Sequence, residues 1–214
     1  LDGYALHYSR DEQTLIEKEG TNVWFKLNLT GTIMANSSFL VRGARHAEDD
    51  DPCVQYIVDK YDMEWYENSN SLLNFDNKGV KILLTSNTNP INVKNPFNID
   101  GNLTKVDGYV DMFGVAGNDV DEFGNLNTID GYEGMYANDI YGQSKNRSFR
   151  RKVTTANGKN YFTDSDNNFI DFEYIDYRFQ DYTVDERYKE IYKVAPHSQS
   201  DGEWLNASPT PPVW

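Results

Sequence analysis

The chain has 214 residues, of which 38% are apolar and 14% aromatic, enough to form a hydrophobic core in one large domain or two small ones. Its 34 acidic and 20 basic residues give a net charge of -14, which excludes nucleic acids and anionic membranes as expected partners because both would repel it. The single cysteine, Cys53, excludes an internal disulfide and a cysteine-based zinc site. No segment predicts membrane insertion, and the opening LDGYALHY lacks the features of a signal peptide. We expect a soluble chain, or one already freed from its export signal.

Short β-rich segments recur along the chain, separated by clusters of Asn, Gly, Asp and Pro that are typical of turns. The predicted strands are YALHY (4–8), NVWFKLNL (22–29), SFLVRG (38–43), VKILLT (80–85), DGYVDMF (107–113) and SFRRKV (148–153). This rhythm predicts an all-β fold with a mostly antiparallel sandwich or barrel.

One segment, residues 52–68, departs from this rhythm. Val54, Ile57, Val58, Tyr61 and Trp65 recur there at spacings of three and four, after Pro52. This spacing predicts one inserted amphipathic helix.

The composition of the chain changes after Asp164: aromatic and charged residues are frequent there, and prolines are frequent near the end. We interpret residues 173–214 as a C-terminal arm and irregular tail that pack on the same domain, anchored by aromatics such as Phe169 and Phe172. Arg150 and Arg151 are expected to pair with nearby acids.

The order of several segments resembles the lamin tail domain in its bacterial form. These segments are LDGYALHY, NVWFKLNLTGTIMANSSFLVRGA, LLNFDNKGVKILLT, VDGYVDMFGVAG, YEG, NRSFRRKV and TDSDNNFIDF. The resemblance covers roughly residues 1–172 and implies an immunoglobulin-like antiparallel β-sandwich. It also implies an accessory module of an exported or cell-surface protein, because bacterial members of the family commonly accompany other domains.

Family members usually open with a strand that precedes the LDG segment, and no such strand precedes it here. From the resemblance we expect that this strand has been trimmed or lost, or that another chain supplies it. A sandwich without it would expose a sheet edge, to which a partner could add a strand.

The segment GNDVDEFGNLNTIDG, residues 117–131, nearly matches a twelve-residue calcium loop. The expected ligands are Asp119, Asp121, the carbonyl of Asn125, Asn127 and Asp130. Phe123 occupies a ligand position without a side-chain oxygen, so an ordinary polar loop stays the alternative.

Two other acidic segments have a structural interpretation. FTDSDNNFID contains Asp164, Asp166, Asn168 and Asp171, whose side chains we expect to cap backbone N–H groups. HAEDDD, residues 46–51, combines His46 with four carboxylates but has no paired histidine spacing, so it is interpreted as a solvated loop.

No nucleophile motif, Walker loop or dinucleotide fingerprint occurs, so no enzyme is predicted. The chain is expected to be a non-catalytic interaction or structural module, extracellular or at the cell surface, with a protein or surface polymer as partner. One alternative is a carbohydrate-binding module with a structural calcium ion. Its candidate stacking residues are Trp65, Tyr66, Tyr132, Tyr136 and Tyr141. A second alternative is an enzyme in which the acid clusters converge around a metal.

Overall fold

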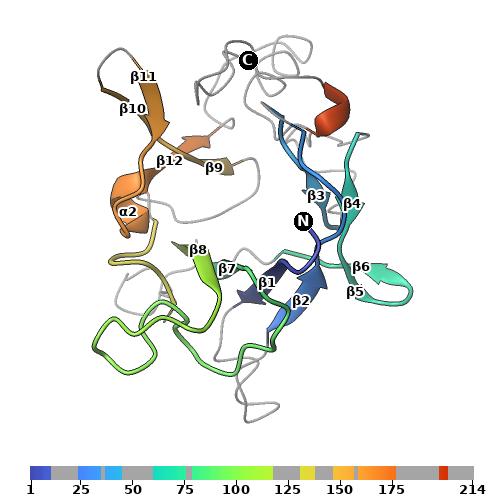
Figure 1. The fold of residues 1–214 in the computed structure, drawn as a ribbon, viewed down its shortest axis with the longest axis horizontal. Helices are drawn as coiled ribbons and strands as arrows, with labels where there is room; N and C mark the ends of the chain where they lie inside the picture. The colour runs from blue at the N-terminus through green and yellow to red at the C-terminus, as the bar shows by residue number, and fades with distance from the viewer. Residues whose placement is uncertain are drawn as a thin grey trace. The chain divides into compact units, whose positions relative to one another are not determined.

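A computed structural model describes residues 1–10, 24–34, 37–44, 60–75, 79–117, 131–137, 147–156, 159–176 and 198–201 (Figure 1). The described residues are mostly β, with antiparallel sheets and one short helix. The chain divides into two compact units. Unit 1 comprises residues 1–32, 75–144 and 164–172, and unit 2 comprises residues 33–74, 145–163 and 173–214.

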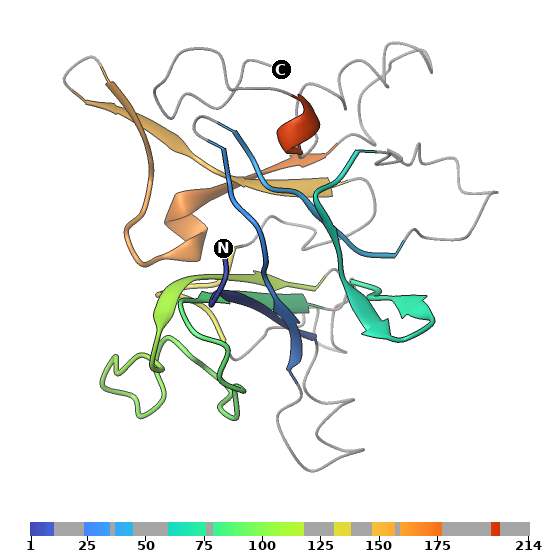
Figure 2. The same cartoon turned by 45° about the vertical axis from the view of Figure 1, so that its right-hand side comes forward.

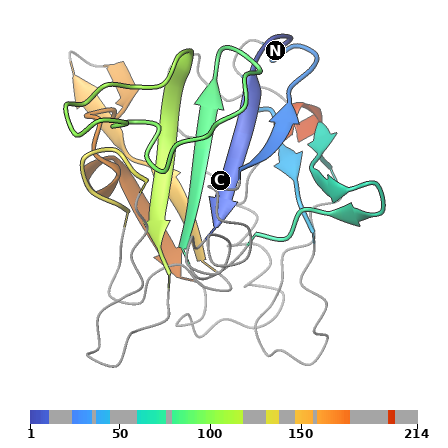
Figure 3. The same ribbon diagram turned by 90° about the horizontal axis from the view of Figure 1, so that it is seen from below.

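Unit 1 is built on a four-stranded sheet with the order β2-β1-β7-β8, in which every neighbouring pair is antiparallel. Figure 3 shows the four strands side by side. Their bounds are Ala5–Arg10 for β1, Phe25–Asn28 for β2, Gly79–Thr85 for β7 and Tyr109–Ala116 for β8. The sequence-based prediction of strands in these four regions is confirmed.

One face of this sheet carries the core of unit 1. Leu83 lies opposite Met112 in the register of β7 and β8, and both are buried together with Ile91 and Phe97 from the connection between these strands. Side chains directly opposite each other in an antiparallel pair point to the same face, so this connection covers the face that carries Leu83 and Met112. Fully burying each large apolar side chain contributes about 1.5–3 kcal/mol.

The other face is also apolar. Tyr8 is fully buried there, with its ring 4.9 Å from that of Phe75 in an edge-on arrangement. Four aliphatic side chains on the same face are only half-buried: Leu6, Leu27, Ile82 and Leu84.

The described part of unit 2 consists of short two-stranded pairs (Figure 2). These are β3 (Val41–Arg42) with β4 (Met63–Glu64), β5 (Tyr66–Asn68) with β6 (Ser71–Leu72), β9 (Arg147–Arg151) with β12 (Phe172–Asp176), and β10 (Val153–Ala156) with β11 (Lys159–Phe162). A short 3-10 helix, η1, spans Gln199–Asp201. Arg150 and Glu173 form an ion pair at 2.6 Å, so the expected pairing of Arg150 is confirmed.

The helix predicted over residues 52–68 is wrong in its described part. Met63–Glu64 and Tyr66–Asn68 are strands, while residues 52–59 lie outside the described residues. Met63 and Glu64 pair in parallel with Val41 and Arg42, more than twenty residues earlier in the chain. Non-local strand pairing therefore outweighs the local spacing of three and four.

The only α-helix among the described residues is α2 (Asn168–Asp171), in unit 1. No helix in the described part of the chain is long and apolar enough to cross a membrane. Of the expected aromatic anchors, Phe172 packs against Phe113 with ring centroids 4.6 Å apart, whereas Phe169 is half exposed.

Candidate functional site: a carboxylate network at the edge of β8

The outer edge of β8 is covered by two segments that are distant in sequence, residues 131–137 and the turn that leads into α2. Ala137 forms a parallel bridge with Val115. Its N–H donates to the carbonyl of Gly114 at 2.7 Å, and its carbonyl accepts from the N–H of Ala116 at 3.2 Å. This short contact pairs only the last part of the strand.

Asn168 completes the edge with its side chain. Its Nδ2 donates to the carbonyl of Met112 at 2.8 Å, and its Oδ1 accepts from the N–H of Gly114 at 2.8 Å. A carboxamide offers one acceptor and two donor hydrogens in a planar group, so Asn168 takes the place of a peptide group in a neighbouring strand. Asn168 is fully buried, which makes these bonds costly to lose.

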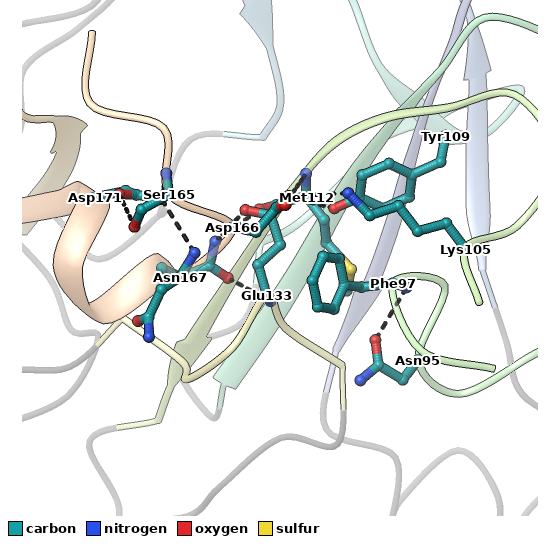
Figure 4. A network of polar contacts seen from close by, with 11 residues as sticks. Asn95, Phe97, Lys105, Tyr109, Met112, Glu133, Ser165, Asp166, Asn167 and Asp171 are labelled. Atoms are coloured by element: carbon teal, nitrogen blue, oxygen red, sulfur yellow. Dashed lines mark hydrogen bonds and ion pairs between the residues drawn. The ribbon is translucent and has the colours of Figure 1, made fainter. Parts of the chain in front are cut away.

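Glu133 lies beside Asn168 and is also buried. Figure 4 shows Glu133 together with Tyr109 and Met112. Its Oε2 accepts from Nδ2 of Asn168 at 3.0 Å, and its Oε1 accepts from the hydroxyl of Tyr109 and from the N–H of Met112 at 3.3 Å. The two residues are also joined through their backbones, because the N–H of Asn168 donates to the carbonyl of Glu133 at 3.0 Å.

Tyr109 is the hydroxyl donor of this network. Burial, and then the hydrogen bond to Glu133, raise the pKa of Tyr109, so the phenol keeps its proton and keeps donating. The Nζ of Lys105 lies 4.7 Å from the centroid of the Tyr109 ring and 4.8 Å from that of Phe97. Lys105 also forms an ion pair with Asp166 at 2.9 Å.

Asp171 organises the turn that precedes α2. Its Oδ2 accepts from the N–H groups of Ser165 at 2.9 Å and Asn167 at 3.2 Å, and its Oδ1 accepts from the Ser165 hydroxyl at 2.7 Å. Asn167 caps α2 by accepting from the N–H of Ile170. The structural interpretation of FTDSDNNFID is therefore confirmed for Asp171 and Asn168, whose side-chain oxygens accept from backbone N–H groups.

Three carboxylates converge at this point. Glu133, Asp164 and Asp171 each offer a ligand oxygen, and these atoms lie within 4.8 Å of one another. They could hold a metal ion, although calcium takes about 6–8 oxygen ligands. The oxygen atoms of Glu133 and Asp171 already accept hydrogen bonds from N–H and O–H donors, and a cation would share these oxygens with them.

The predicted calcium ligands Asp119, Asp121, Asn125, Asn127 and Asp130 lie outside the described residues, as do Tyr141, Cys53 and the segment HAEDDD. Calcium binding by residues 117–131 stays a prediction.

The remaining aromatic candidates have different surroundings. Trp65 is 2% exposed, so it does not present a ring face to solvent, whereas Tyr66 is 50% exposed. Tyr132 and Tyr136 are half-buried and contact each other edge-on, with ring centroids 5.6 Å apart. Sugar binding by these residues stays a prediction, and among the described ones Tyr66 is the most open.

Sequence reasoning missed Glu133 as a partner of Asn168, and Tyr109 as a partner of Glu133. Glu133 lies in the YEG segment, one of the segments that resemble the lamin tail domain, but nothing in that segment indicates which of the 34 acidic residues is buried.

Comparisons with protein-family models, curated proteins and solved structures find no match to this chain.

Proposed function

We propose that this chain is a non-catalytic interaction module of an exported or cell-surface bacterial protein. The observation that carries the proposal is the hydrogen bonding of the buried acids. Glu133 and Asp171 accept from hydrogen-bond donors on both carboxylate oxygens. Glu133 closes the edge of β8 with Asn168, and Asp171 holds the turn that precedes α2. A general acid or base has to reach a substrate proton, whereas these two side chains are about 1% exposed or less. The hydrogen bonds of Glu133 and Asp171 therefore serve to stabilise the fold of unit 1.

The sheet of unit 1 is, in this proposal, one layer of a β-sandwich of the lamin-tail type. The half-buried Leu6, Leu27, Ile82 and Leu84 support it, because an apolar sheet face requires a second layer to remove it from water. The family assignment itself rests on the order of sequence segments.

Binding of an extended partner segment would use the outer edge of β2, the first strand in the sheet order. The N–H of Leu29 donates to the carbonyl of Tyr4 at 2.9 Å, and inward-facing bonds alternate along an antiparallel pair. The backbone groups of Lys26 and Asn28 therefore point away from β1. No other described strand pairs with this edge, so it offers a template for strand addition.

The proposal is tested by incubating the purified, fluorescently labelled chain with insoluble surface polymers such as peptidoglycan sacculi, chitin and cellulose. We expect saturable retention on at least one polymer that persists at high salt, because a chain with net charge -14 should not rely on ionic adsorption. The supernatant is assayed for soluble products, with and without divalent metal ions. Release of products that grows with time would contradict a non-catalytic role, and absence of retention would remove surface polymers as partners.

A further inference from the structure

Unit 2 carries a second cluster of interacting side chains, which we call the Tyr66 patch and define as Arg42, Tyr61, Glu64 and Tyr66. Arg42 and Glu64 lie opposite each other in the pairing of β3 and β4 and form an ion pair. The Tyr66 hydroxyl donates to Oε2 of Glu64 at 2.6 Å. The guanidinium carbon of Arg42 lies 3.7 Å from the centroid of the Tyr61 ring.

The backbone beneath this patch is held by Trp65. The N–H of Trp65 donates to the carbonyl of Arg42 at 2.9 Å, and its carbonyl accepts from the N–H of Leu73 at 2.7 Å. Its buried side chain points opposite to its neighbours, because successive side chains in a strand alternate. Trp65 therefore anchors the segment while Tyr66 faces solvent.

The patch is electrically neutral, since the charges of Arg42 and Glu64 cancel. Hydrogen bonds from Tyr66 and then from Arg42 lower the pKa of Glu64, and the bond to Glu64 raises the pKa of Tyr66. Glu64 is thus charged and Tyr66 is protonated near neutral pH. Because its proton is directed at Glu64, the hydroxyl oxygen of Tyr66 keeps acceptor lone pairs for other donors, on a residue that is 50% exposed.

We infer that the Tyr66 patch binds a neutral sugar unit of a polysaccharide. A sugar ring offers hydroxyl donors for the phenol oxygen and carboxylate, and an apolar C–H face for the aromatic ring. Fixing Tyr66 and Arg42 before binding lowers the ordering cost that a free surface tyrosine would have. This inference names the partner class of the proposed interaction module and rests on that proposal.

Affinity electrophoresis in native gels tests the inference, with laminarin, galactomannan or hydroxyethyl cellulose as the neutral probe in the gel. We expect at least one probe to retard the chain. Tyr66→Ala should weaken this retardation by about tenfold or more, as for a central aromatic contact. Tyr66→Phe should weaken it less, because the ring stays and only the hydroxyl is lost.

Tyr161→Ala is the matched control, because Tyr161 belongs to the same unit and is 47% exposed. It should bind the probe as well as the unaltered chain does. Circular dichroism and the migration of each variant in a probe-free gel verify that the variants are folded. Retardation by no probe, or equal retardation of the unaltered chain and Tyr66→Ala, would overturn the inference. If Tyr66→Ala is still retained on insoluble polymers as the unaltered chain is, the inference fails while the interaction module stands.

Discussion

Acidification should destabilise the protein through His7, which lies in the centre of the sheet of unit 1. His7 is fully buried, and its Nε2 lies 3.0 Å from the Thr85 hydroxyl, while Nδ1 has no hydrogen-bond partner. Burial, and then the positive charge of Lys26 on the neighbouring strand, lower the pKa of His7 to about 4. The folded state therefore favours the neutral imidazole.

The sign and size of the effect follow from linkage between proton binding and unfolding. The folded pKa of about 4 lies below the value of 6.5 expected when unfolded, so protons bind the unfolded state preferentially. The stability that depends on neutral His7 is present above pH 6.5 and is lost as the pH falls toward 4. At about 1.4 kcal/mol per pKa unit, the loss approaches about 3 kcal/mol, a large share of the usual 5–15 kcal/mol for a domain.

Urea unfolding between pH 7.5 and 4.5 measures this loss, with His7→Gln as the comparison that cannot titrate. Carboxylates titrate in both proteins, so we follow only the difference between their free energies of unfolding. Between pH 7.5 and 4.5, the free energy of unfolding of the unaltered chain should fall by about 2.5 kcal/mol more than that of His7→Gln. A difference that is constant with pH, or a His7 pKa near 6.5 in an NMR titration, would refute the reasoning.

Three further predictions concern the acids and their partners. Asn168→Leu should lower the free energy of unfolding by about 3 kcal/mol or more, because it leaves buried groups of β8 and Glu133 unsatisfied; urea denaturation that shows less than 1 kcal/mol would contradict the edge-closing role. Lys105→Met should change stability by less than about 1 kcal/mol in the same assay, since its ion pair is exposed. Millimolar calcium should raise Tm if residues 117–131 bind it. Asp119→Ala with Asp121→Ala should abolish that rise while Asp164→Asn preserves it; the reverse pattern would place calcium at the carboxylate network.

The principal strands of unit 1 could be predicted from the sequence because their signal is local. Alternating apolar residues and flanking turn residues mark Ala5–Arg10, Gly79–Thr85 and Tyr109–Ala116, and each was found where the pattern predicts a strand. The capping role of Asp171 could also be predicted from the sequence, because it accepts from backbone N–H groups only four to six residues away.

Residues 60–68 show where local pattern fails. Tyr61 and Trp65 have helical spacing, yet Trp65 is held between Arg42 and Leu73 by backbone hydrogen bonds. Arg42 lies in β3 and Leu73 directly follows β6, so the hydrogen bonds that decide the conformation of Trp65 cannot be predicted from its own segment.

The contact between Glu133 and Asn168 depended on tertiary structure entirely. Composition and turn chemistry determined an acidic, β-rich chain with capped turns, because these properties depend on residue type and short spacing. The sequence does not state that Glu133 meets Asn168, which is 35 residues away, or that together they satisfy the edge of β8. Only the folded sheet brings these groups together, since strand pairing and burial select one acid among many and turn it into a hydrogen-bond acceptor of the interior.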